Sequence, residues 1–103
     1  MLNLTPHAIT LRTAAGDVIF PPSGAVARVA TLETVIGEHA GVPVISRSFG
    51  DVSGLPADGT PCIVSALVLG ACAGRPGVYA PDSGPTAIRE NGQVVAVTRL
   101  VAA

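Results

Sequence analysis

The chain has 103 residues and a net charge of −1, a length that suits one domain and leaves no room for two. Hydrophobic residues make up 49% and charged residues 13%, a composition that excludes a disordered chain. Aromatic residues are scarce and tryptophan is absent. We therefore expect residues 1–103 to fold as a single domain around Val, Ile, Leu and Ala side chains.

All six cations are arginines, and the chain has no lysine. Proteins that bind duplex nucleic acid normally carry surplus positive charge, and those that bind single strands carry stacking aromatic residues. Neither feature is present, so we expect no general nucleic-acid binding. A small anion needs only two or three placed arginines and stays open as a ligand. The low surface charge also predicts burial of surface between the subunits of a homo-oligomer.

The chain carries no sign of export or of membrane insertion. The longest apolar run, residues 62–73, is interrupted by Ser65 and Gly70 and is too short to span a membrane. No basic region precedes an apolar stretch at the N-terminus, so we expect no signal peptide. Cys62 and Cys72 lack metal-ligand spacing and predict buried, reduced thiols in a cytoplasmic protein, with a disulfide as the alternative.

The first half of the chain predicts two β-hairpins. Residues 2–11 alternate in hydropathy around Pro6, which predicts an edge strand or a bulge, and residues 18–20 return after a turn at residues 13–17. Residues 25–36 are rich in β-branched side chains and predict a long extended segment. Its predicted partner is the strand 42–49, across a loop at residues 37–41, and Pro43 favours an edge position for that strand.

The middle of the chain predicts the only helix. Residues 61–64 form a short apolar run after a turn, which is typical of a buried strand. Ser65 is a favourable N-cap for a helix near 66–73, and Gly74 is suited to follow its last turn. A single strand continuing through Leu69 is the alternative. Residues 77–81 predict another short strand.

Near the C-terminus, Asn91-Gly92 lies between two extended runs, residues 86–90 and 93–101, and predicts a type I′ hairpin. The consecutive apolar residues 94–97 predict a central strand with both faces buried. Together the segments predict a mainly β fold of the α+β kind, with about seven to nine short strands and one short helix. The expected architecture is a small antiparallel β-barrel or a curled sheet.

No catalytic or metal-binding constellation stands out. Ser65 follows an apolar strand, but its neighbours Val64 and Ala66 are not the glycines of a nucleophile elbow. His7 and His39 have no metal-ligand spacing. We therefore expect no enzyme activity, no metal and no cofactor.

Arginines give the sharper indication of a site. Arg28 lies in the long extended segment and Arg89 directly precedes the Asn-Gly turn; each has the alternative of a solvated or ion-paired surface side chain. If they converge, their guanidinium groups can hold one anion together with hydroxyls, a histidine and the N–H groups that a Ser65 cap leaves free. The predicted ligand-binding set is Asn3, Thr5, His7, Arg28, Ser65 and Arg89.

The order of several short motifs carries a family resemblance. These motifs are Asn3-Leu4-Thr5-Pro6-His7, Pro22-Ser23-Gly24, Ala27-Arg28-Val29, Gly41-Val42-Pro43-Val44, Gly54-Leu55-Pro56, Ile63-Val64-Ser65-Ala66-Leu67-Val68, Pro81-Asp82 and Arg89-Glu90-Asn91-Gly92. With them, nearly the whole chain resembles a group of small, uncharacterised bacteriophage and prophage proteins that begin Asn-Leu-Thr-Pro-His. The resemblance implies a phage accessory or structural role in the bacterial cytoplasm, and it brings no established activity.

Two functions of different classes fit these observations. The first is an anti-defence sponge, a phage protein that sequesters a nucleotide-derived, anionic immune signal of the host without cleaving it. The second is a phage structural, assembly or protein-interaction module with no small ligand. Arginines that meet in one cleft favour the first function, and dispersed arginines favour the second.

Overall fold

The computed structural model describes residues 1–103 and is mainly β, as predicted, with one short helix. Its ten strands form four small sheets, and no closed barrel encloses them. The largest sheet has the order β1-β6-β7-β10 and is built from β1 (Leu2–Asn3), β6 (Cys62–Ile63), β7 (Val78–Pro81) and β10 (Leu100–Ala102). Because β6 runs parallel to both β1 and β7, this sheet is mixed, while the other strand pairs are antiparallel, as expected for a mostly antiparallel fold.

The core is small and lies around β6. Cys62, Ile63 and Val64 are almost wholly buried, as predicted for a short apolar run in a strand covered on both faces. They pack with side chains from the N-terminal segment, β7 and the helix α1 (Ala66–Gly70). Only 13 of the 103 residues are buried, so most of the chain lies outside this core.

The helix is present as predicted but is only five residues long. The hydroxyl of Ser65 caps it by accepting a hydrogen bond from the backbone N–H of Val68 at 3.3 Å. Gly74 follows with a φ of +77°, a conformation that glycine adopts without a steric penalty. Val68 is the one helical residue that is buried, and it anchors the helix to the core.

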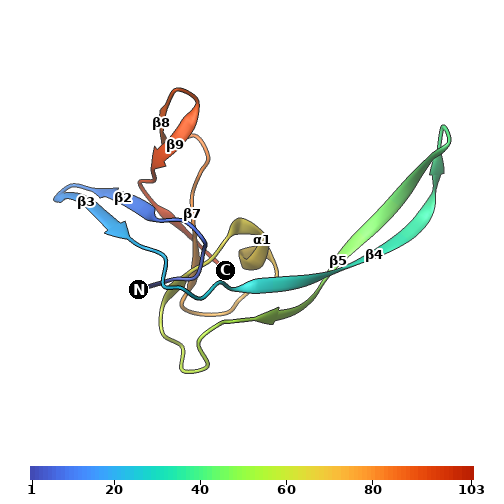
Figure 1. The fold of residues 1–103 in the computed structure, drawn as a ribbon, viewed down its shortest axis with the longest axis horizontal. Helices are drawn as coiled ribbons and strands as arrows, with labels where there is room; N and C mark the ends of the chain where they lie inside the picture. Colours follow the sequence, from blue (N-terminus) through green and yellow to red (C-terminus); the bar gives the residue numbers. More distant parts are fainter.

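Three two-stranded hairpins project from this body (Figure 1). They are β2–β3 (Ile9–Thr13 and Gly16–Phe20), β4–β5 (Arg28–His39 and Val42–Ser53) and β8–β9 (Ile88–Glu90 and Gln93–Ala96). The β4–β5 hairpin is the longest, and it extends far from the body on the side opposite β2–β3 (Figure 1). We call the part of this hairpin beyond Ala30 and Gly50 the arm.

The arm is longer than predicted because the expected loop at residues 37–41 is mostly strand. Gly37, Glu38 and His39 pair with Val44, Pro43 and Val42, and a register shift at Ile36 accommodates the pairing. The turn is the two residues Ala40-Gly41, both with positive φ. The expectation of a loop is wrong because the sequence places alanine where a type I′ turn usually has asparagine.

The C-terminal hairpin forms as predicted, with Asn91 at φ 52° and Gly92 at φ 78°. The expectation of one central strand over residues 93–101 is wrong. β9 ends at Ala96 and lies in a two-stranded sheet, while β10 begins at Leu100 and pairs with β7. Val94 and Val95 are 42% and 40% exposed, whereas Ala96 and Val97 are buried, because the chain enters the body after the hairpin.

Candidate functional site

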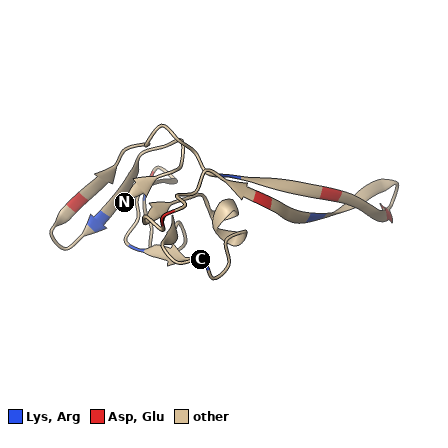
Figure 2. Ribbon diagram, turned by 90° about the horizontal axis from the view of Figure 1, so that it is seen from below, with Lys and Arg blue, Asp and Glu red and all other residues tan.

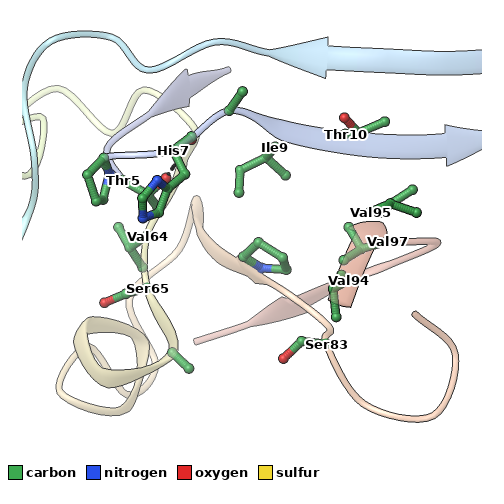
Figure 3. A pocket seen from close by; sticks show the side chains of 15 residues that line it. Thr5, His7, Ile9, Thr10, Val64, Ser65, Ser83, Val94, Val95 and Val97 are labelled. Carbon is green, nitrogen blue, oxygen red and sulfur yellow. Dashed lines mark hydrogen bonds between the residues drawn. The ribbon is translucent and has the colours of Figure 1, made fainter. Parts of the chain in front are cut away.

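A pocket of about 460 Å³ lies where three parts of the chain meet (Figure 3). One wall is residues 5–10, the end of the link between β1 and β2 with the start of β2. The others are the junction of β6 with α1 and residues 94–97 of β9 and just beyond it, with Pro81 and Ser83 beside them. Its lining is largely apolar, with polar groups from Thr5, His7, Thr10, Ser65 and Ser83. Figure 3 shows His7 beside Val64 and Ser65, and Ser83 beside Val94.

Asn3 and Thr5 are buried and hydrogen-bonded to each other, and Thr5 also lines this pocket. The amide nitrogen of Asn3 donates to the carbonyls of His7 at 2.7 Å and Phe20 at 2.9 Å, and its oxygen accepts from the backbone N–H of Thr5 at 3.0 Å. The hydroxyl of Thr5 lies 2.7 Å from that same oxygen and 3.0 Å from the carbonyl of His7. With these partners, both side chains hold the bend at Pro6 in place.

His7 and Ser65 are the predicted site residues that this pocket brings together with Thr5. His7 is exposed. Its backbone carbonyl accepts hydrogen bonds from Asn3 and Thr5, while its imidazole has no hydrogen-bond partner within the chain. Ser65 holds α1 by its hydroxyl. Because α1 is little more than one turn, its dipole adds little to the binding of an anion.

Arg28 lines a second, smaller pocket of about 260 Å³. The two pockets adjoin each other, since Thr5, Pro6 and Ser65 line both. The remaining lining of the second pocket is apolar and comes from the N-terminal segment, the start of β4 and α1. Arg28 therefore lies near two of the other predicted residues, Thr5 and Ser65, but it does not line the pocket that contains His7.

Arg89 lines neither pocket. Its guanidinium group donates to the carbonyl of Gly84 at 3.0 Å and to the carbonyl of Ser83. These bonds fold the connection between β7 and β8 against the β8–β9 hairpin. The structure therefore does not bring Arg28 and Arg89 together. Arg89 contributes to the larger pocket only indirectly, by holding the backbone of Ser83, which lines it.

Asp82 organises the same connection from the other side. The guanidinium of Arg99 and the backbone N–H of Gly84, at 3.0 Å, donate to its carboxylate. The hydrogen bond from Arg99 is the main reason that the pKa of Asp82 lies below its ordinary value, and the bond from Gly84 adds to it. A carboxylate and two arginines thus fix the loop that carries Ser83.

The thiols are reduced and buried, as predicted. Burial raises the pKa of Cys62, which keeps its thiol protonated and unreactive at neutral pH. No group of three or more His, Cys, Asp or Glu side chains is placed to hold a metal ion. Likewise, no helix has both the length and the apolar character needed to cross a bilayer.

The arm exposes many large apolar side chains, and the sequence analysis did not identify it as a candidate site. Leu32, Val35, Ile36 and Val42 are each more than 60% exposed, and Val44, Ile45 and Phe49 are between 40% and 46% exposed. The sequence signal was the presence of apolar residues on both faces of two long strands with no third strand predicted beside them. Figure 2 shows the arm extending away from the body with only a few charged residues along it.

No family model, no curated protein and no solved structure matches this chain.

Proposed function

We propose that this protein is an assembly or protein-interaction module whose arm is covered by another polypeptide in its working state. The observation that carries the proposal is the apolar, solvent-exposed arm. A two-stranded hairpin that contacts nothing is at best marginally stable in water. The arm, which is the outer part of a hairpin with two twelve-residue strands, therefore needs a partner surface to hold its conformation.

The distribution of apolar side chains supports the proposal. Monomeric proteins rarely expose large contiguous apolar patches, and patches of that kind are typical of interaction sites. Here seven Leu, Ile, Val and Phe side chains are exposed along the arm, while the buried core contains only six side chains of these kinds. The resemblance to small phage proteins supports placing this assembly in the cytoplasm of an infected bacterium.

Photo-crosslinking in the producing cell tests the proposal. A photoreactive amino acid replaces Val35 on the arm or, as the matched control, Ile19 on β3, because the two side chains are 68% and 62% exposed. Irradiation is expected to give a discrete adduct heavier than the 10.2 kDa chain from position 35 and none from position 19. Equal yields, or no adduct from either position, would contradict a covered arm.

Purified protein gives a second readout of the same proposal. Replacing Val35 and Ile45 together by serine removes apolar contact area from the arm and leaves the core untouched. Hydrogen exchange at the arm amides is expected to speed up in this variant when the partner is present, because the covered hairpin opens more often. The double replacement Val18→Ser and Ile19→Ser on β3 is the control and should leave the arm unchanged.

A second candidate function, the anti-defence sponge, is favoured by one observation. The two adjoining pockets make a continuous depression, with the free imidazole of His7 in one part, Arg28 in the other, and Thr5 and Ser65 between them. An elongated, nucleotide-derived ligand with a ring at one end and an anionic group near Arg28 fits this distribution. Binding without cleavage is proposed, since no catalytic group accompanies these residues.

A thermal-shift panel of cyclic dinucleotides, ADP-ribose derivatives and NAD tests the sponge. A ligand at one hundred times its dissociation constant stabilises the folded state by about 2.7 kcal/mol. His7→Ala and Arg28→Ala are expected to weaken binding by about tenfold or more, because each removes a polar contact from a partly desolvated site. A panel without shifts, or a ligand recovered in cleaved form, would contradict this second candidate.

A further inference from the structure

Cross-strand register divides the arm into two faces, and one of them has a distinctive pattern. Thr31 pairs with Phe49, Glu33 with Arg47, and Val35 with Ile45. Directly paired residues lie on the same side of a sheet, so these six side chains share one face, which we call the paired face. The ring of Phe49 lies near Gly70 of α1, so this face begins against the body and continues outward as free surface.

Charge on the paired face is balanced. Arg47 donates to the carboxylate of Glu33 at 2.8 and 3.0 Å, and both side chains stay about half exposed. The apolar pair Val35–Ile45 lies on one side of this ion pair along the arm, and the Thr31–Phe49 pair lies on the other. A strongly acidic or basic partner would leave one of the two charges unmatched. The paired face of a second copy carries the same two charges. Its Arg47 can lie beside Glu33 of the first copy, and its Glu33 beside Arg47 of the first copy.

The surface area of the chain matches what a dimer must bury. The accessible surface is 6571 Å². A compact monomer of this mass exposes about 5,300 Å², so the chain exposes about 1,200 Å² more than its size requires. A stable protein–protein interface takes about 800 Å² from each partner. The excess therefore suffices for one interface of ordinary or larger size, and the arm, as the longest of the three projecting hairpins, contributes to it.

We propose that the occupant of the arm is a second copy of this chain, and that the two copies meet through their paired faces. The inference rests on the proposed assembly function and names its partner. A two-fold related pair uses the same surface on both subunits, which a face with balanced charge and flanking apolar residues permits. Packing of two such ribbons covers Val35 and Ile45 and encloses the Glu33–Arg47 pairs.

Charge-swapped variants test this partner directly. Among the six residues of the paired face, Glu33→Arg leaves two cations and Arg47→Glu leaves two anions, so copies of either variant should repel each other. The dissociation constant of each homodimer, measured by sedimentation at low salt, is expected to rise by about tenfold or more. An equimolar mixture of the two variants is expected to recover a complex of twice the chain mass.

Association in the mixture reports contacts between two arms, because mixing does not restore the ion pair within either arm. The double variant Glu33→Arg with Arg47→Glu restores that internal pair, and it should form a homodimer like the unmodified protein. Asp17→Arg is the matched control: it disrupts the exposed Arg12–Asp17 pair on β2–β3 with the same change of charge as Glu33→Arg. This control should leave the dimer intact, and circular dichroism confirms that each variant is folded.

The outcomes separate this inference from the proposed function. An unmodified protein that is monomeric at all concentrations overturns the inference, as does a mixture that fails to associate. Mass spectrometry of the adduct from position 35 then decides the broader proposal. An adduct with a different protein overturns the second copy as occupant and leaves the assembly function standing, whereas the absence of any adduct overturns both.

Discussion

The side chain of Asn3 connects the bend around Pro6 to the end of β3. It bonds to the carbonyl of Phe20 at the end of β3, to the carbonyl of His7 and to the N–H of Thr5. The position is 2% exposed, so water cannot replace these partners if the amide is lost. Asn3 and Thr5 were expected to bind a ligand, and the structure gives both a role in holding the chain around Pro6.

Asn3→Ala is expected to lower the free energy of unfolding by about 2 kcal/mol or more, because it leaves buried donors and acceptors without partners. Urea denaturation measures the change. Ser23→Ala is a suitable control, since Ser23 makes its side-chain hydrogen bonds at an exposed turn and should cost little. A loss as small as that of Ser23→Ala would show that Asn3 is not a structural residue.

The contribution of Asp82 to the free energy of unfolding changes with pH in a predictable direction. Its pKa in the folded chain lies below the ordinary value of 3.8, mainly because Arg99 donates to the carboxylate. The stabilisation is therefore present above pH 3.8 and is lost as the pH falls through the lower, folded-state pKa. We expect Asp82→Asn to be less stable than the unmodified protein at pH 7, with a gap that narrows at pH 3. A gap of equal size at both pH values, measured by urea denaturation, would contradict this account.

Sequence reasoning about single residues succeeded where the chemistry is local. The cap at Ser65 and the turn at Asn91-Gly92 depend on a few adjacent residues and were predictable. The environment of Arg89 was not, because its partners are carbonyl oxygens of Ser83 and Gly84, groups that every residue carries. Whether His7, Arg28 and Ser65 bind a ligand stays a prediction.

At the level of elements, two hairpins use the same kind of turn with different residues. Asn91-Gly92 and Ala40-Gly41 both have positive φ at each position. Asparagine tolerates this conformation, whereas alanine pays a steric penalty of about 1–2 kcal/mol from its Cβ. The arm therefore keeps an unfavourable turn that contacts elsewhere must offset.

Ala40→Asn is expected to stabilise the arm by about 1 kcal/mol, and Asn91→Ala to destabilise the β8–β9 hairpin by a similar amount. Hydrogen exchange of the amides flanking each turn reads the two hairpins separately. Slower exchange near residue 40 in the first variant and faster exchange near residue 91 in the second are the expected results. No change in either hairpin would mean that the turns do not limit local opening.

The elements that sequence reasoning missed depend on contacts distant in the chain. Residues 94–97 are uniformly apolar, yet Val94 and Val95 belong to an exposed hairpin while Val97 pairs with Thr10 and Arg12 of β2. Local pattern cannot separate a buried strand from a strand that enters the body halfway along. The parallel pairing of β1 with β6 joins residues 60 apart and leaves no trace in local periodicity.

The whole molecule is unusually extended for its size. Its radius of gyration is 16.3 Å. A compact domain of this length has a radius of gyration of about 13 Å. Figure 1 shows the cause, since the arm and the two shorter hairpins project in different directions from a small body. Stability that depends on a partner should then depend on the concentration of that partner.

The midpoint of thermal unfolding is therefore expected to rise with protein concentration, because association stabilises only the folded chain. The rise should be smaller in the Glu33→Arg variant, whose paired faces repel. Calorimetry over a hundredfold range of concentration measures both. A midpoint that is independent of concentration in the unmodified protein would contradict a self-associating fold.

Alternation of side chains along the arm limits how its length can vary. Removing one residue from each strand between the Thr31–Phe49 and Val35–Ile45 pairs would place Val35 and Ile45 on the opposite side of the ribbon from Phe49, since successive side chains point to opposite faces. Only deletions or insertions of even size in both strands preserve the shared side. Arms shortened by two residues per strand should thus keep their preference for like arms, whereas those shortened by one should lose it.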